Sequence, residues 1–158
     1  MLRLWRICAK VHADGAFSGE GAYRFGGRWN PPGATLVYAS TTLSFAALEL
    51  YVNVEPEDVP SAFVSIEAQV PDKISMQTID AKSLPAAWRR CPAPPALQAI
   101  GLRWLERNQT LLLNVPSVVI PEERNILINP LHPEFSRLTM QAPKPFSFDP
   151  RTWTRRSR

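Results

Sequence analysis

Residues that bind metals or form disulfides are scarce in this sequence. Its 158 residues include two cysteines, Cys8 and Cys91, and two histidines, His12 and His132. With the two cysteines 83 positions apart and only two histidines beside them, these residues build neither the disulfide framework of a small secreted protein nor the ligand spacing of a zinc site. An apolar run of about 18 residues and a leader-like start are also missing, so we expect a cytoplasmic protein with reduced thiols, no metal and no membrane contact.

Acidic residues are missing from the C-terminal tail, which carries the whole excess of charge. Four of the 18 basic residues are arginines at positions 151–158, and the other 14 balance the 14 acidic residues. The net charge of +4 therefore belongs to the tail alone. A neutral body argues against direct nucleic-acid binding, whereas a short basic end is typically solvated or contacts a partner.

The length fits one domain, and the many prolines predict short elements joined by stiff turns. We expect a single α+β domain over residues 1–150 and a separate tail over 151–158. A long structured loop is predicted at 13–33, a helix capped by Thr41 or Thr42 at 43–52, and a helix opened by Pro94 and Pro95 at 96–108. Strands are predicted at 2–9, 35–40, 63–70, 74–79, 115–120, 126–129 and 145–148.

Glu49 is the most informative single residue. It is the only charged residue between Trp29 and Val54, and it falls in an apolar helix. A carboxylate in such surroundings must find a partner, become protonated or face a cleft, and Arg28 is the obvious partner. The alternative is an ordinary exposed glutamate on the helix surface.

Arg28 lies in a segment rich in glycine and proline, FGGRWNPPG at residues 25–33. An arginine held on a glycine turn suits a pyrophosphate or a carboxylate, because its planar fork binds two oxygens at once. The segment fits neither the phosphate-loop pattern nor the Rossmann pattern. A simple tight turn with an exposed arginine is the competing interpretation.

Several polar residues have both a structural and a functional interpretation. Tyr38, near a strand end, is either core packing with a tethered hydroxyl or a platform for a flat heterocycle. Ser117 lacks a nucleophile-elbow pattern, so a serine-hydrolase triad is not expected. Asn125, Asn129 and His132 cluster near the end of the chain, where turn capping is the simpler role.

Taken together, these segments resemble the RES family of bacterial toxins. The resemblance covers roughly residues 3–137, and the middle, 55–112, contributes nothing to it. It rests on WRI at 5–7, GEGAYRFGGRWN at 19–30, VYAS at 37–40, LE at 48–49, VPS at 115–117, Asn125 and NPLHP at 129–133.

The resemblance implies an ADP-ribosyltransferase-like fold, with mixed or antiparallel sheets and short helices, and NAD⁺ as a substrate with no bound cofactor. Arg28, Glu49 and Ser117 occupy the positions that give the family its name, and Tyr38 fits the aromatic position of the site. Arg6 matches a further arginine of the family. The set assigned to NAD⁺ binding is Arg6, Arg28, Tyr38, Ser117 and Asn129.

The implied activity is that of a toxin that degrades NAD⁺ by hydrolysis or phosphorolysis and is neutralised by an Xre-type helix-turn-helix antitoxin. Glu49 would stabilise the positive charge that develops on the ribose, and Arg28 would hold a phosphate. Tyr38 would stack on nicotinamide, and Ser117 would bond its ribose or amide. Transfer of ADP-ribose to a protein and a non-catalytic binding module are the alternatives. The resemblance leaves open a homodimer or a larger toxin–antitoxin assembly.

Overall fold

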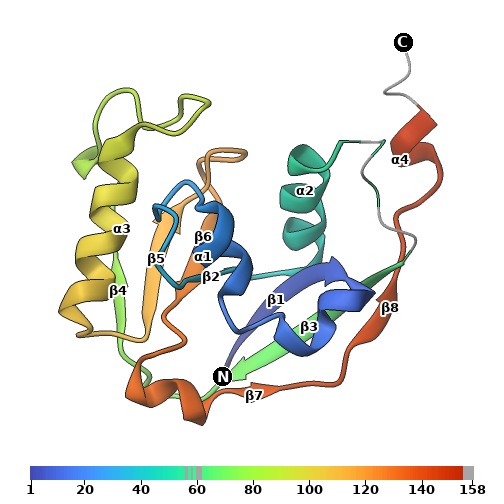
Figure 1. The fold of residues 1–158 in the computed structure, drawn as a ribbon, viewed down its shortest axis with the longest axis horizontal. Coiled ribbons are helices and arrows are strands. Elements are labelled where there is room, and N and C mark those ends of the chain that lie inside the picture. The colour runs from blue at the N-terminus through green and yellow to red at the C-terminus, as the bar shows by residue number, and fades with distance from the viewer. Residues whose placement is uncertain (56, 58, 60–61, 155–158) are drawn as a thin grey trace.

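One mixed β-sheet organises the chain, and helices cover it on both sides (Figure 1). A computed structural model describes residues 1–55, 57, 59 and 62–154. The strands are β1 (Leu2–Ala9), β2 (Val37–Ser40), β3 (Phe63–Val70), β4 (Met76–Thr78), β5 (Leu112–Pro116), β6 (Arg124–Ile128), β7 (Thr139–Met140) and β8 (Lys144–Phe146). The helices are η1 (Lys10–Gly15), α1 (Glu20–Phe25), α2 (Leu43–Asn53), η3 (Ala81–Ser83), α3 (Pro95–Arg107), η4 (Pro133–Arg137) and α4 (Arg151–Thr154).

The strand order is β4-β5-β6-β2-β1-β3-β7, with β8 also pairing with β3. β4 and β5 run parallel, whereas all the other described pairs are antiparallel. β1 pairs with β3 along its whole length, from Leu2↔Val70 to Ala9↔Phe63. Towards β2 it has one registered pair in the described chain, Trp5↔Ser40. The sheet is therefore nearly split at this point, which we call the seam.

Both halves of the sheet contribute to one central core. Leu4 and Ile66 come from β1 and β3, Val37 and Ile126 come from β2 and β6, and all four are buried in the same cluster. Side chains from the two sides of the seam therefore pack together on one face of the sheet. The remaining faces of these strands point outward and need covering by helices.

Two helices cover these outer faces. The Thr42 hydroxyl accepts a hydrogen bond from Phe45 N and so starts α2, which packs through Ala46 over the β1–β3 half. α3 begins after Pro94 and packs through Trp104 over the other half. The seam thus lies between the areas that α2 and α3 cover, with α1 in front of it (Figure 1).

Most of the expected elements are confirmed, some of them with their bounds. The strands at 2–9 and 63–70 and the helix capped by Thr42 are correct. The strand expected at 115–120 is wrong, because β5 occupies Leu112–Pro116. The segment 13–33 is not a loop throughout, because η1 ends in it and α1 lies within it. β7 was not expected.

The C-terminal end also differs from a free tail. α4 falls in the segment 151–158, and the Tyr51 hydroxyl on α2 donates a hydrogen bond to Thr152 O. Three of the four tail arginines, at 155, 156 and 158, lie outside the described residues. Among the described helices, none combines the length and apolar character that crossing a membrane requires.

Candidate active site

The seam between β1 and β2 opens into a cleft of about 200 Å³. Three of the six predicted site residues, Arg6, Tyr38 and Glu49, line this seam cleft together, although they come from β1, β2 and α2. A fourth, Ser117, forms a direct hydrogen bond with Glu49. The full lining is Trp5, Arg6, Ile7, Tyr38, Ala39, Ser40, Ala46, Glu49, Leu50, Asn53 and Asn125.

Two neutral donors hold the Glu49 carboxylate. Ser117 Oγ donates to Glu49 Oε1 at 2.7 Å, and Asn125 Nδ2 donates to the same oxygen at 2.8 Å. In the described chain the second oxygen, Oε2, has no hydrogen-bond partner. The carboxylate is therefore fixed in orientation, has no ion-pair partner in the described chain, and has one oxygen left for a ligand.

Ser117, which donates a hydrogen bond to Glu49, is itself fixed by backbone hydrogen bonds. Its side chain is fully buried, and its Oγ accepts hydrogen bonds from the N–H groups of Val119 and Ile120, at 3.0 and 3.3 Å. The hydroxyl donates its hydrogen to Glu49, and its oxygen accepts from the backbone of the turn after β5. This geometry makes Ser117 a positioning residue for the carboxylate.

Arg28 does not pair with Glu49, which corrects that prediction. One terminal nitrogen donates to the carbonyl oxygens of Trp88 and Arg90, both at 3.0 Å, and the other donates to Cys91 Sγ at 3.2 Å. The guanidinium thus ties its own glycine-rich turn to the segment before α3. The complementary charges of Arg28 and Glu49 suggested a pair, but carbonyl groups 60 or more residues away satisfy the arginine instead.

Tyr38 and the glycine-rich turn form one rigid unit. The Tyr38 hydroxyl donates to Asn30 Oδ1 at 2.7 Å and accepts from Trp29 N at 3.0 Å, and burial raises the pKa of this phenol. A Cβ on Gly27 would lie 2.5 Å from the hydroxyl oxygen, and one on Gly101 would lie 1.7 Å from Trp29 O. Because neither Gly27 nor Gly101 has a side chain, the turn can lie directly between Tyr38 and α3.

Arg6 lies at the centre of the seam with donors to spare. One terminal nitrogen donates to Tyr38 O at 2.7 Å, and Nε is the one buried side-chain nitrogen or oxygen without a partner in the described chain. Burial lowers the pKa of Arg6, and the nearby Cys8 acts weakly in the opposite direction. A buried guanidinium with an unused donor is suited to binding an anionic group.

Comparison with known proteins places the chain in a family. Residues 3–149 match the RES domain. The chain belongs to the RES toxin family. It is 34% identical over 151 residues to Toxin Res of Yersinia enterocolitica, covering 95% of this chain and 99% of that toxin. It is 36% identical over 151 residues to the Prs ADP-ribosylating toxin of a Sphingobium strain, covering 93% and 94% of the two chains.

The fold of this RES domain also matches a solved structure. The Mycobacterium tuberculosis MbcT–MbcA toxin–antitoxin complex contains a chain that aligns with a TM-score of 0.76 at 19% identity, over 92% of this chain and 84% of that one. Over 92 residues the sequence is 38% identical to the NAD⁺ phosphorylase MbcT of the same species, covering 58% and 46% of the two chains. The predicted ADP-ribosyltransferase-like α+β fold is confirmed.

Asn129 is not brought into the seam cleft of this RES domain. Its Nδ2 donates to Asn108 Oδ1 at 2.8 Å, and its Oδ1 accepts from Leu131 N at 3.1 Å. Nearby, His132 Nδ1 accepts from Glu134 N and caps η4. Both residues therefore have the turn-capping role that was the simpler interpretation, and a role for Asn129 in NAD⁺ binding finds no support in these contacts.

The sequence interpretation missed Asn125 as a site residue. It treated Asn125 as one of a group of turn-capping residues, whereas this side chain is the second donor to Glu49. A signal existed, because Asn125 is a polar residue inside a short apolar strand, and such a residue must find a partner.

In the described part of the RES domain, no three His, Cys, Asp or Glu side chains group closely enough to hold a metal ion.

Proposed function

We propose that this RES domain is a toxin that cleaves the bond between nicotinamide and ribose in NAD⁺. The observation that carries the proposal is the Glu49 carboxylate, which is oriented through one oxygen, has no partner at the other in the described chain, and lines a cleft together with Arg6. As the nicotinamide leaves with the bonding electrons, positive charge develops on the ribose. A fixed carboxylate stabilises that charge more in the transition state than in the substrate.

We assign the other residues around this reaction from their contacts. Arg6, with its unused buried donor, binds a phosphate oxygen of the dinucleotide. The ring of Tyr38, fixed through its hydroxyl, forms a wall beside the nicotinamide riboside. Ser117 orients Glu49 instead of bonding the ribose, because its hydrogen is already donated to the carboxylate. A phosphate contact from Arg28 requires the release of carbonyl partners, so we assign it no direct role.

Relatives support this chemistry and differ in the group that accepts ADP-ribose. MbcT is named a phosphorylase of NAD⁺, whereas the Sphingobium relative is named an ADP-ribosylating toxin. Destruction of NAD⁺ by water or phosphate is our first candidate. Modification of a protein is the second, and the similarity to the Sphingobium toxin over nearly the full length of both chains favours it. All three outcomes share the first step, loss of nicotinamide.

One experiment separates these outcomes. Purified protein is incubated with NAD⁺ alone, with added phosphate, and with a bacterial lysate, and the products are identified by mass spectrometry. Free ADP-ribose indicates hydrolysis, a phosphorylated ADP-ribose indicates phosphorolysis, and a mass increase on a lysate protein indicates transfer. Absence of nicotinamide release in all three mixtures would reject the proposed function.

The same proposal includes an antitoxin partner. The solved relative is a toxin–antitoxin complex, and the family resemblance implies a partner of the Xre helix-turn-helix type. A cleft with an open carboxylate oxygen and an unused arginine donor gives such a partner polar groups to cover. In the cellular form of the experiment above, expression of the toxin alone should arrest growth, and co-expression of the antitoxin should restore it.

A further inference from the structure

The seam cleft is too small for a whole dinucleotide. Its volume is about 200 Å³, whereas pockets that enclose a drug-sized ligand span about 300–1,000 Å³. The cleft holds Glu49 and Tyr38, so the reacting half of the substrate belongs there under the proposed function. The other half, the adenosine phosphate, must lie in a neighbouring space.

Two further cavities share Arg6 with the seam cleft. The first measures about 160 Å³ and shares both Arg6 and Tyr38 with the cleft. The second measures about 510 Å³ and shares Arg6 and Gly15 with the first. Arg6 therefore lines all three spaces, and its buried Nε has no hydrogen-bond partner in the described chain.

The middle cavity has the character of a passage for a diphosphate. Glycines at positions 15, 19, 21 and 26 line it, so few side chains fill it. The one carboxylate on its wall, Glu20, is engaged by Arg24 Nε at 2.7 Å and is largely exposed. A diphosphate lying here would meet glycine backbone and the Arg6 guanidinium, with the acidic side chain already paired.

The large cavity, between η1 and α1, has the character of a purine site. Phe25 and Val11, two of the most exposed large apolar side chains of the described chain, both line it, with 82% and 85% of their surface exposed. His12, Ser18 and Arg24 add polar groups to the same walls. A flat heterocycle binds well to an exposed aromatic ring, because stacking removes the two facing surfaces, one of each ring, from water.

We propose that the cavity between η1 and α1 binds the adenine end of the substrate, with the purine stacked on Phe25 and the diphosphate held by Arg6. This site rests on the proposed function for the identity of the ligand. It makes Phe25 a specificity residue that distinguishes a dinucleotide from nicotinamide mononucleotide, which has no adenosine. A protein partner that covers Phe25 and Val11 is the competing explanation of their exposure.

Binding of ADP-ribose, which lacks nicotinamide, tests the site directly. Calorimetry compares wild-type protein with Phe25→Ala and Phe25→Trp. Loss of one stacked ring costs roughly five- to tenfold in affinity at such an exposed position. We expect that loss in Phe25→Ala and near wild-type binding in Phe25→Trp. Tyr23→Ala is the matched control, because Tyr23 is an exposed aromatic on the same helix that does not line the cavity.

Kinetics separate this site from the proposed function. With NAD⁺, Phe25→Ala should raise KM by the same five- to tenfold factor and leave kcat within about twofold, because the purine does not change during the reaction. If wild-type protein releases no nicotinamide but binds ADP-ribose in a Phe25-dependent way, the activity is wrong and the purine site stands. If nicotinamide is released but Phe25→Ala binds ADP-ribose like wild type, or no ADP-ribose binds, the purine site is wrong.

Discussion

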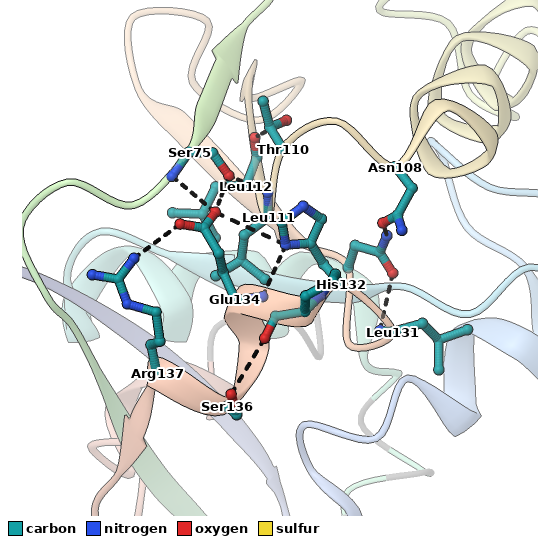
Figure 2. Close-up of polar contacts among 12 residues, drawn as sticks. Ser75, Asn108, Thr110, Leu111, Leu112, Leu131, His132, Glu134, Ser136 and Arg137 are labelled. Carbon is teal, nitrogen blue, oxygen red and sulfur yellow. Dashed lines mark hydrogen bonds and ion pairs between the residues drawn. The ribbon is translucent and has the colours of Figure 1, made fainter.

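Two polar clusters of the molecule differ in how completely their groups are bonded. In the cluster around η4, Glu134 accepts from Ser75 N at 3.2 Å and from the Ser75 hydroxyl through one oxygen, and from Arg137 at 2.9 Å through the other (Figure 2). In the seam cleft, Glu49 is bonded through Oε1 alone. Each cluster is built on a glutamate and a serine, yet only one of them leaves donors or acceptors unused.

The difference indicates what each cluster contributes. The Glu134 cluster joins three segments, because Ser75 Oγ also accepts from the buried N–H of Leu111, and both carboxylate oxygens of Glu134 have hydrogen-bond partners. Closed networks of this kind stabilise a fold. The seam cleft has a carboxylate oxygen and a buried Arg6 donor without hydrogen-bond partners in the described chain, and unsatisfied polar groups beside a cleft are typical of a ligand site. We therefore expect substitution of Glu134 to affect stability and substitution of Glu49 to affect catalysis.

The largest expected effect is on catalysis, in Glu49→Gln compared with Glu134→Gln. Glutamine at 49 keeps the shape and loses the negative charge opposite the developing cation, so nicotinamide release should fall by about 10²–10³-fold. Its thermal midpoint should stay close to that of wild type, because the carboxylate has no ion pair to lose in the described chain. Glu134→Gln should lower the thermal midpoint and leave turnover per folded molecule unchanged.

Equal turnover in wild type and Glu49→Gln would show that Glu49 has only a structural role. Loss of turnover in Glu134→Gln, measured on protein that circular dichroism shows to be folded, would contradict the separation of the two clusters. Both variants replace one carboxylate by an amide, so each serves as the control for the other.

The sequence predicted the elements whose signals are local. Thr42 marks the start of α2, and regular patterning marks β1 and β3. α1 escaped prediction, because three closely spaced glycines are typical of a loop; in the structure Gly19 and Gly26 flank the helix, and only Gly21 lies within it. β5 was misplaced because three successive leucines at 111–113 face two different cores, a pattern that periodicity does not recognise.

At the site, the sequence indicated the residue types but not their pairing. Arg6, Tyr38 and Glu49 do meet in one cleft, as the family resemblance implied. The partners of Glu49 lie 68 and 76 residues away in the chain, and no local pattern connects them. Arg28 was paired with Glu49 on charge alone, since backbone carbonyls, which satisfy it here, leave no trace in a sequence.

A middle-sized effect on stability should come from Ser75→Ala. This change leaves the buried N–H of Leu111 without its acceptor and takes a donor from Glu134. An unsatisfied buried donor costs about 1–3 kcal/mol of unfolding free energy, measurable by urea denaturation. Ser136→Ala is the matched control, because the exposed Ser136 hydroxyl reaches only Pro133 O, at 3.3 Å. Equal stability of the two variants would mean that the network around Glu134 contributes nothing.

The smallest expected effect is a pH dependence confined to the closed cluster. The Ser75 hydroxyl, with smaller help from Ser75 N, Arg137 and His132, lowers the pKa of Glu134. In the unfolded chain the pKa of this carboxyl is about 4.3, so its ionised form stabilises the fold above that pH. That contribution is lost as the pH falls through the lower pKa of the folded state. The thermal midpoints of wild type and Glu134→Gln, measured from about pH 7 down to about pH 3, should therefore converge in acid. Taking the difference between the two proteins removes the titration of all other carboxyls, which both share. A difference that stays constant over this range would mean that the hydrogen bonds to Glu134 do not depend on its charge.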